Sequence, residues 1–389
     1  GDAHPSLREL IAAPAEHTRL HDTEITQPAL FAVGWSLAAL WRSWGVEPAA
    51  VLGHSIGEIT AAAVAGVMSV GDALRLVVAR GQVLGALPRD GAMVAVGASV
   101  DVVQEVLDGQ RIDLDIAAVN APDEAVISGE RGAVHRAMAR FEERGLRARE
   151  LRVSHAFHSP LVEPALPPFA AALEGMALRQ PHLPLYSALT GRLAGAEVAS
   201  VDYWVRHVRG TVRFADAVQS AVADGLSVFV ECGPRPILSG AGARTEPSTS
   251  WTGALHPDHD DRERLLTSLG TLFLRGLDPR WRAVHRGAPL GVLPPYPFQR
   301  RRHWLEAVQR REDDGAHLPL LRVDWVRASP GVVDLDGNWV VVGNPGGLGG
   351  ALQSRLHDHG LDAHCSPAVQ GRKGCRVVAF VERGIAGME

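Results

Sequence analysis

One pentapeptide, Gly53-His54-Ser55-Ile56-Gly57, constrains the fold of this chain more than any other segment. Apolar, β-prone residues precede it from Ala49 to Leu52, and a helix-forming run follows from Glu58 to Val64. A G-x-S-x-G sequence between a strand and a helix is typical of a nucleophile elbow, a sharp turn that exposes a serine hydroxyl. We expect both glycines to be required, because a Cβ at either position would meet crowded backbone. The backbone N–H of Ile56, at the helix start, is then placed to stabilise an oxyanion.

The bulk composition favours two or three soluble domains and excludes several classes of protein. A chain of 389 residues is too long for one ordinary core. The net charge of −5 gives no reason to expect a nucleic-acid partner, and neither a signal peptide nor a membrane-spanning apolar stretch is present. Three cysteines without metal-ligand spacing fit a reducing cytosol, so we expect a cytoplasmic protein with no bound metal. The chain starts at Gly1 and stops in mid-pattern at Glu389, which indicates a piece of a longer protein.

The order of helical and strand-like segments suggests a core with an inserted subdomain. From about 91 to 154 the predicted order is β-α-β-β-α-β, the ferredoxin-like pattern. Around this insert we expect the following elements: a helix over Gln27–Trp44, two helices over Glu58–Leu87 divided near Ser69–Asp72, a buried strand at Ser227–Glu231, an irregular polar segment at Thr245–Asp261 and a helix over Arg262–Arg275.

Beyond this region the pattern changes twice. The proline-punctuated segment Leu293–Trp304 interleaves aromatic residues with arginines, which predicts an extended segment lying across a protein surface. A new αβ pattern begins at Leu320, with strands at Trp339–Val342 and Arg376–Val381 and a helix at Ala351–His359. The Gly-rich turn Gly343–Gly350 fails the dinucleotide fingerprint in its glycine spacing, so we expect no bound nucleotide.

A serine nucleophile needs a base, and His158 is the best candidate among the seventeen histidines. It follows a predicted strand, just before Pro160, where a loop would point into a cleft. No aspartate is evident as a third triad member, and a backbone carbonyl could orient the imidazole instead. Arg80, if it faces the cleft, could bind a substrate carboxylate through two hydrogen bonds. Gln27, at the start of a helix, could donate into the same cleft or merely cap.

Together these residues resemble the acyltransferase domain of modular type I polyketide synthases over roughly residues 5 to 305. The motifs that carry the resemblance are Thr26–Phe31, Gly53–Glu58, Arg80-Gly81, Ala118–Pro122, His155–Pro160, Val212–Phe214 and Val230–Pro234. The resemblance implies an α/β-hydrolase-like acyltransferase core over residues 1–255 with a ferredoxin-like insert at about 91–154. It further implies a post-acyltransferase linker over 256–317 and a partial Rossmann-like α/β segment over 318–389, the beginning of a ketoreductase structural subdomain.

The resemblance also implies a ping-pong mechanism and a role for each residue. Ser55 would be acylated by malonyl-CoA, with His158 as base and acid and Arg80 on the malonate carboxylate. The N–H of Ile56 would be half of an oxyanion hole, and Gln27 and Asn120 would line the pocket. The acyl group would pass to the phosphopantetheine thiol of an acyl carrier protein. The acyltransferase would bind no cofactor, and ketosynthase and ketoreductase domains of the same polypeptide would be its neighbours.

The resemblance extends to the choice of extender unit. In this family, domains that select malonyl-CoA have His-Ala-Phe-His before the serine that corresponds to Ser159, and a branched aliphatic residue after the nucleophile. Here His155, Phe157 and Ile56 fit that pattern. Bulky Phe157 would fill the space that a 2-methyl group needs, although one methyl is worth only about 1–3 kcal/mol.

The chain departs from the family at two points, and other functions stay open. The family's domain begins with a strand containing Gly-Gln-Gly whose glutamine completes the oxyanion hole, and residues 1–389 contain no such segment. His207 stands where the family usually has asparagine, which leaves the geometry of that loop open. A serine hydrolase of acyl thioesters and an inactive scaffold fragment are the alternatives. Arg80 discriminates malonyl transfer from the hydrolase, because an esterase acting on neutral acyl groups has no use for it.

Overall fold

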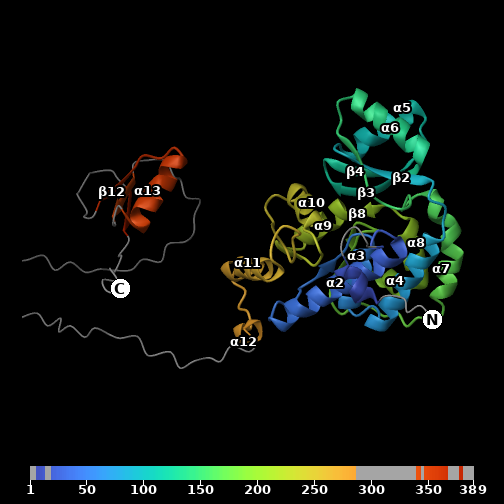
Figure 1. Cartoon of the computed structure of the whole chain (residues 1–389), viewed down its shortest axis with the longest axis horizontal. Coiled ribbons are helices and arrows are strands. Elements are labelled where there is room, and N and C mark those ends of the chain that lie inside the picture. The colour runs from blue at the N-terminus through green and yellow to red at the C-terminus, as the bar shows by residue number, and fades with distance from the viewer. Residues whose placement is uncertain (1–5, 14–18, 286–338, 343–345, 367–375, 380–389) are drawn as a thin grey trace, which may run out of the picture. The chain divides into compact units, whose positions relative to one another are not determined.

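The computed structural model describes residues 6–13, 19–285, 339–342, 346–366 and 376–379. The chain forms two compact units, residues 1–294 and 295–389 (Figure 1). Helices and strands alternate through both units, so the fold is mixed α/β. Within the described ranges, none of the helices combines the length and the apolar character needed to cross a membrane.

The serine of the elbow lies between a short strand and a helix, as the sequence predicts. Strand β1 (Val51–Leu52) is shorter than the expected run from Ala49, and helix α3 (Ile56–Val64) begins directly after Ser55. β1 pairs in parallel with β6 (Leu185–Ser187), a strand from much later in the chain. The elbow therefore lies at the carboxyl end of a parallel strand, where α/β sheets place their ligand sites.

Two further helices pack beside the elbow helix. α2 (Thr23–Ser43) and α4 (Val70–Gly85) contact each other and α3, and the break between α3 and α4 falls where the sequence predicts it. Ile59, Leu76 and Leu84 are completely buried in the resulting core. Each such side chain contributes about 1.5–3 kcal/mol by leaving water. This apolar contact holds in place the two helices that carry polar residues of the site.

The two glycines of the elbow differ in the space around them. A Cβ on Gly53 would lie 2.3 Å from the backbone nitrogen of Glu58 and from the carbonyl carbon of Gly57, closer than non-bonded atoms approach. A Cβ on Gly57 would meet no atom within 4 Å. The expectation that both positions require glycine is therefore right for Gly53 and wrong for Gly57, which faces open space in the first turn of α3.

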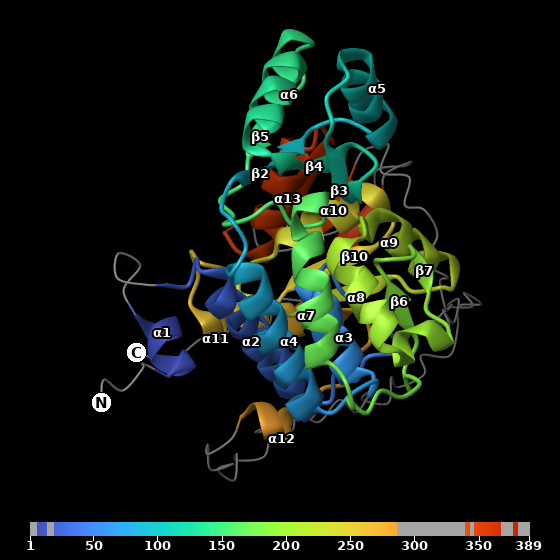
Figure 2. The same cartoon turned by 90° about the vertical axis from the view of Figure 1, so that its right-hand side faces the viewer.

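Residues 91–150 form a second sheet with two helices on one face (Figure 2). The elements follow the predicted order: β2 (Gly91–Val96), α5 (Val100–Gln110), β3 (Asp115–Ala121), β4 (Glu124–Glu130), α6 (Arg131–Glu143) and β5 (Ala148–Glu150). The strand order is β5-β2-β4-β3, and β8 (Val212–Arg213) adds to β3 in parallel. The pairing of β8 with β3 therefore joins this sheet to the chain segment just after Gly210.

Of the remaining elements of the first unit, β7 (Arg192–Leu193) pairs with β6 in the first sheet, β9 (Val228–Glu231) and β10 (Ser250–Gly253) form a two-stranded sheet, and the others are helices. The helices are α1 (Leu7–Ala12), α7 (Leu166–Ala172), α8 (Val201–Arg209), α9 (Phe214–Ala223), α10 (Ile237–Thr245), α11 (Asp261–Leu274) and α12 (Trp281–Val284), with 3-10 turns at Pro160–Ala165 and Ala196–Ala199. β9 and α11 fall where the sequence predicts a strand and a helix.

Two expectations about this region are wrong. β10 forms inside the segment expected to be irregular, because β9 offers a parallel partner and Trp251 stacks on Phe229 with ring centroids 4.2 Å apart. β9 is also less buried than expected. It has a single neighbour in a two-stranded sheet, and Val228 is 42% exposed. Both differences arise from tertiary pairing, which local sequence does not encode.

Helix α11 packs inside the first unit. Its leucines at 265, 269 and 272 form an apolar cluster with Trp41 and Trp44 of the α2 region. The segment from residue 256, which the sequence analysis assigns to a linker, therefore contributes to this core. The boundaries at 255 and 317 stay predictions, and the proline-rich segment Leu293–Trp304 lies outside the described residues.

In the second unit, three parallel strands and one helix are described. These are β11 (Trp339–Val342), α13 (Leu348–Asp358), β12 (Ala363–Ser366) and β13 (Arg376–Ala379), with strand order β12-β11-β13. β12 is not among the elements expected from the sequence, because its Ala-His-Cys-Ser run lacks the β-branched and aromatic residues that favour strands. Residues 343–345 of the Gly-rich turn lie outside the described ranges.

Gly53→Ala is expected to destabilise the fold, and Gly57→Ala is its matched control. The methyl group at 53 would overlap backbone of the elbow, and overpacking of this kind typically costs about 1–3 kcal/mol. At 57 the methyl group is unhindered, and alanine in place of a helical glycine stabilises by up to about 1 kcal/mol. Urea unfolding of both variants measures the difference. An equal loss of stability in the two would contradict the crowding argument.

Candidate active site

Ser55 lies at the junction of β1 and α3 with a strained backbone. Its φ of 49° and ψ of −119° lie outside the regions that L-residues favour. Ile56 is the first residue of α3, and the N–H groups of a first helical turn have no acceptor within the helix. The positive end of the helix dipole and a backbone donor therefore lie beside the hydroxyl, which is the arrangement that stabilises an oxyanion.

The hydroxyl of Ser55 is hydrogen-bonded to His158, which lies 103 positions later. Ser55 Oγ is 2.9 Å from His158 Nε2, and His158 Nδ1 is 2.7 Å from the carbonyl oxygen of Gly210. A carbonyl can only accept, so Nδ1 carries the proton and Nε2 is left to accept from the serine. Of the alternatives that the sequence leaves open for orienting the base, the structure has the backbone carbonyl.

The surroundings of His158 favour its neutral form. The side chain is buried, with 4% exposed, and its backbone φ of 58° is left-handed, as rarely seen outside glycine. Burial, and then the positive charge of Arg80, hold the pKa of His158 well below the ordinary value of 6.5. A neutral imidazole with its Nε2 lone pair aimed at a hydroxyl can act as a general base.

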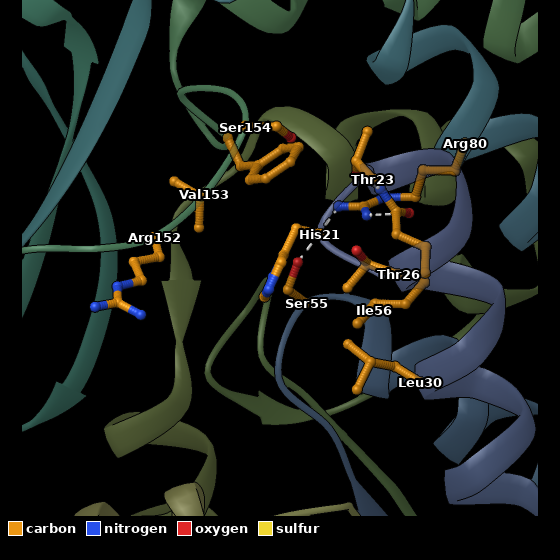
Figure 3. Close-up of a pocket in the computed structure, with 12 residues that line it drawn as sticks. His21, Thr23, Thr26, Leu30, Ser55, Ile56, Arg80, Arg152, Val153 and Ser154 are labelled. Atoms are coloured by element: carbon orange, nitrogen blue, oxygen red, sulfur yellow. Dashed lines mark hydrogen bonds between the residues drawn. The ribbon is translucent and has the colours of Figure 1, made fainter. Parts of the chain in front are cut away.

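Arg80 extends from α4 to the serine (Figure 3). One guanidinium nitrogen donates to Ser55 Oγ at 3.3 Å, and the other donates to Gln27 Oε1 at 2.6 Å. The side chain is 3% exposed, and burial lowers its pKa to about 10, so it remains charged at neutral pH. In the part of the chain that the structure describes, no acidic side chain pairs with Arg80 and its Nε has no hydrogen-bond partner. A buried unpaired cation is costly, which favours the binding of an anionic group there.

Gln27 holds Arg80 in place. It lies in α2 with 5% of its surface exposed, and its amide nitrogen donates to Thr23 Oγ1 at 2.7 Å. Because its oxygen accepts from Arg80, Gln27 lines the cleft as an orienting partner of the guanidinium. Thr23 was not identified from the sequence, since a threonine at a helix start is most often only a cap.

Ser55, Arg80, Gln27 and Thr23 line a pocket of about 190 Å³, and His158 lies behind Ser55, outside the lining residues. Figure 3 shows Ser55 in its middle, with Thr26 and Leu30 of α2 on one side and residues 152–154 on the other. The walls thus come from α2, the elbow, α4 and the segment that leaves the small sheet after β5. A group attached to Ser55 would lie beside the guanidinium of Arg80.

Phe157 and His155 contribute to the pocket in different ways. Phe157 is half-buried and lines it directly. His155 is buried outside the pocket wall, where its Nε2 donates to the carbonyl of Leu87 at 3.0 Å and its Nδ1 is 2.8 Å from Ser154 Oγ. Its ring centroid is 6.0 Å from that of Phe157. His155 therefore supports two residues of the pocket wall, Ser154 and Phe157, without lining the pocket itself.

Asn120 is expected from the sequence to line the pocket, but it is not among the lining residues. Its Oδ1 is 2.8 Å from Nε2 of His54, and its amide nitrogen donates to Glu124 at 3.0 Å. These bonds direct the side chain to the residue before the nucleophile. Burial lowers the pKa of His54, and the hydrogen bond that its Nε2 donates to Asn120 Oδ1 partly offsets that effect. Asn120 thus supports the elbow from the small sheet, through β3.

His207 lies on α8 with 3% of its surface exposed and does not reach the pocket. Its Nε2 is 3.5 Å from Oε2 of Glu58, a carboxylate with no exposed surface. The sequence analysis missed both Glu58 and the carbonyl of Gly210. A charged residue inside the apolar run of α3 is a signal that could have identified Glu58. A backbone carbonyl leaves no trace in a sequence, so Gly210 could not be found in that way.

The other candidate chemistries have little support in the residues described. No group of three or more metal-ligating side chains occurs among them. Burial raises the pKa of the Cys232 thiol to about 12, so it remains protonated and is a poor nucleophile. Ser55, with His158 Nε2 at 2.9 Å from its hydroxyl, is therefore the candidate nucleophile of this site.

Sequence comparison identifies the family. The acyl transferase domain, as a family of sequences, matches residues 5–279 of the chain. The chain belongs to the acyl transferase family. Polyketide synthase GfsA of Streptomyces halstedii is 39% identical over 377 residues, which cover 94% of this chain and 5% of that protein. Mycoketide-CoA synthase of Mycobacterium tuberculosis is 42% identical over 357 residues, which cover 91% of this chain and 8% of that protein. The acyl transferase chain thus spans less than a tenth of these relatives.

Solved structures agree with this assignment. The acyltransferase domain from the second module of the salinomycin polyketide synthase is 44% identical with a TM-score of 0.69, over 75% of this chain and 69% of that one. The malonyl-CoA:acyl carrier protein transacylase of Xanthomonas oryzae is 33% identical with a TM-score of 0.62, over 68% of this chain and 85% of that one. The first unit of this acyl transferase therefore has the mixed α/β fold of such domains.

Acylation of Ser55 by a neutral activated ester should be nearly independent of pH from about pH 8 down to about pH 6.5. The unprotonated imidazole is the active form, and the pKa of His158 lies well below 6.5, so the rate should fall only at lower pH. Nitrophenol release from a nitrophenyl ester, corrected with Ser55→Ala, measures this profile. A half-maximal rate at the ordinary histidine pKa would contradict the assignment of a desolvated base.

Proposed function

We propose that this chain transfers a malonyl group from malonyl-CoA to the phosphopantetheine thiol of an acyl carrier protein, as one domain of a modular polyketide synthase. The single observation that carries the proposal is the buried guanidinium of Arg80, which lies 3.3 Å from Ser55 Oγ and has no acidic partner among the described residues. A malonyl group is an acyl group with a carboxylate at its far end. Ser55 can therefore react with the thioester end of the malonyl group while Arg80, in the same pocket, binds its carboxylate end.

Each proton and bond of the reaction has a group to handle it. Ser55 Oγ attacks the thioester carbonyl carbon as its proton passes to Nε2 of His158. The negative charge that develops on the carbonyl oxygen is stabilised by the N–H of Ile56. The carbon–sulfur bond then breaks, and His158 returns the proton to the CoA thiolate. The pantetheine thiol repeats the sequence in reverse, with malonyl-Ser55 as the electrophile.

Arg80 and Gln27 supply the selectivity for an acid-bearing acyl group. The planar guanidinium can bind the malonyl carboxylate through two hydrogen bonds, and Gln27 holds it in that orientation. A hydrolase of neutral acyl thioesters would leave this cation unpaired in a buried site. Transfer of a charged acyl group is therefore favoured over simple hydrolysis.

The partners follow from the same chemistry. CoA arrives as part of the substrate and phosphopantetheine arrives on the carrier protein, so the acyltransferase needs no cofactor of its own. The relatives are large synthases of which this chain spans less than a tenth, which supports further synthase domains in the same polypeptide. The neighbours proposed here are a ketosynthase and a ketoreductase domain. The three parallel strands and helix of the second unit support its assignment as the beginning of a Rossmann-like ketoreductase structural subdomain, preceded by a post-acyltransferase linker.

The small sheet fits a ferredoxin-like inserted subdomain. Its element order and its strand order β5-β2-β4-β3 support that assignment. The segment 152–157 that leaves it forms one wall of the pocket, so the insert would shape the space around the acyl group. Phe157 occupies this wall and His155 supports it, which favours malonyl over branched extender units.

Malonyl-CoA is expected to add one malonyl group to the full chain, and Ser55→Ala should abolish the adduct. Arg80→Ala should slow malonylation by about 10–200-fold, the worth of a charge-assisted hydrogen bond, and should leave acetylation by acetyl-CoA largely intact. Arg75→Ala, an exposed arginine on the same helix, is the matched control. Intact-mass analysis after brief mixing measures the rates of malonylation and acetylation for the wild type and each variant.

Two outcomes would oppose the proposal. Absence of a malonyl adduct on the folded wild-type chain would exclude the transfer. An equal loss of malonylation and acetylation in Arg80→Ala would exclude carboxylate recognition and leave a general serine acylation.

Phe157→Ser should raise the use of methylmalonyl-CoA relative to malonyl-CoA. Removing the ring opens room for a 2-methyl group, and one methyl is worth roughly 10–200-fold in such a pocket. Phe273→Ser makes the same change at an exposed phenylalanine of α11 and serves as the control. Competition between the two CoA thioesters, read from the mass of the acyl-enzyme, gives the ratio. An unchanged ratio in Phe157→Ser would refute the steric explanation.

A further inference from the structure

The carboxylate of Glu58 is buried directly behind the reacting residues and takes no part in the mechanism above. Glu58 is the third residue of α3, none of its surface is exposed, and it does not line the pocket. A buried carboxylate destabilises a fold unless hydrogen bonds satisfy it. The identity of its partners therefore shows what the charge holds together.

Three groups from two later segments contact this carboxylate. The backbone N–H of Ala188, after β6, donates to Oε2 at 2.8 Å. The phenol of Tyr203 donates to Oε1, and Nε2 of His207 lies 3.5 Å from Oε2. Burial and the charge of Glu58 raise the pKa of Tyr203, so the phenol stays a donor. Nδ1 of His207 is buried without a hydrogen-bond partner among the described residues, so the single proton of a neutral ring fits on Nε2, towards Glu58.

Both segments lead to the carbonyl that orients the base. Tyr203 and His207 lie on α8, which ends at Arg209, and Gly210 follows with its N–H bonded to the carbonyl of Arg206 at 2.8 Å. On the other side, the carbonyl of Ala188 accepts from the N–H of Arg213 at 2.6 Å. Gly210 is thus held between two anchors, and each of them ends on the carboxylate of Glu58.

Gly210 also has little freedom to move towards its neighbours. A Cβ at this position would lie 2.3 Å from Leu189 Cδ1 and 3.2 Å from the carbonyl oxygen of Arg206. Leu189 follows the Ala188 peptide that binds Glu58. Close packing therefore transmits the position of the Ala188 segment and of α8 to the carbonyl of Gly210.

The same residue is tied to the nucleophile through its backbone. The N–H of Glu58 donates to the carbonyl oxygen of Ser55 at 2.9 Å, in the first turn of α3. One residue thus bonds to the nucleophile through its main chain and to the support of the base through its side chain.

We propose that Glu58 is a positioning residue that sets the distance between Ser55 Oγ and His158 Nε2, by fixing the carbonyl of Gly210 through α8 and the Ala188 peptide. It touches neither substrate nor reacting atoms. The inference deepens the proposed acyl transfer and rests on it for the choice of substrate, but the placement of the His158 imidazole is a property of the free protein.

Glu58→Gln is the first test. Glutamine has the same shape, but an amide nitrogen replaces one of the two oxygens, so it cannot accept from Ala188 at one position and from Tyr203 at the other. Because a misplacement of about 1 Å can cost about 10²-fold in rate, we expect the first-order rate of malonylation at saturating malonyl-CoA to fall about 10–100-fold. Half-saturation by malonyl-CoA should change by less than about twofold, since Arg80 and Gln27 are untouched.

A second measurement needs no turnover. Long-range proton–nitrogen correlation spectra of the histidine-labelled full chain report which imidazole nitrogen carries the proton. The His158 signal, assigned by its loss in His158→Asn, should show the Nδ1–H tautomer in the wild type and a mixture of tautomers in Glu58→Gln. Thr252→Val is the matched control, because it removes a buried hydrogen bond to Ser268 of 2.8 Å that has no connection to His158.

The outcomes separate this inference from a purely structural role. A wild-type rate or an unchanged His158 tautomer in Glu58→Gln would overturn it, as would a rate loss no larger than that of Thr252→Val at matched stability. If Glu58→Gln does not fold, Tyr203→Phe is the second variant, because it removes one donor from the carboxylate. It should give the same tautomer change with a smaller loss of rate. An unchanged His158 tautomer in Tyr203→Phe would overturn the inference. Failure of malonyl-CoA to acylate the wild type would contradict the proposed function, while the tautomer would still decide the role of Glu58.

Discussion

The chemistry of this site depends on one hydrogen bond, from Nδ1 of His158 to the carbonyl of Gly210. That bond places the single proton of a neutral imidazole on the side away from the serine, so Nε2 can accept from Ser55. An aspartate would do the same and would add a negative charge that raises the basicity of the ring. A carbonyl gives orientation with only a weak electrostatic effect, so the base here remains neutral and desolvated.

Several unfavourable features are concentrated around that bond. Both Ser55 and His158 have positive φ, and Arg80 is buried without an acidic partner in the described part of the chain. Each is of a kind that persists only where the surrounding structure over-determines it. The apolar core of α2, α3 and α4 and the carboxylate of Glu58 provide that determination. The stability of the elbow region and the reactivity of the serine are therefore linked through the same contacts.

The sequence predicts those parts of the molecule that local pattern encodes. The elbow, the break between α3 and α4, the β-α-β-β-α-β order and the candidates Ser55, His158 and Arg80 all follow from short motifs or periodicity. The freedom of Gly57, the strand β10 and the contact of Asn120 with His54 do not, because each depends on which distant segment packs beside it. The carbonyl of Gly210 marks the limit of such reasoning, since any residue could supply it. Only the charged Glu58 within an apolar helix was a readable signal that the sequence analysis left unused.

The charge of Arg80 links recognition of the substrate to the basicity of His158 in the proposed reaction. The positive charge of Arg80 is one cause of the lowered pKa of His158, second only to burial. In the proposed reaction, a malonyl carboxylate bound to the guanidinium would offset that charge. The offset would raise the pKa of His158 towards its ordinary value and make the ring a stronger base while the correct substrate is present. A neutral acyl group leaves the charge of Arg80 uncompensated and the base weaker. Recognition of the carboxylate and activation of the serine are thereby coupled through a single buried arginine.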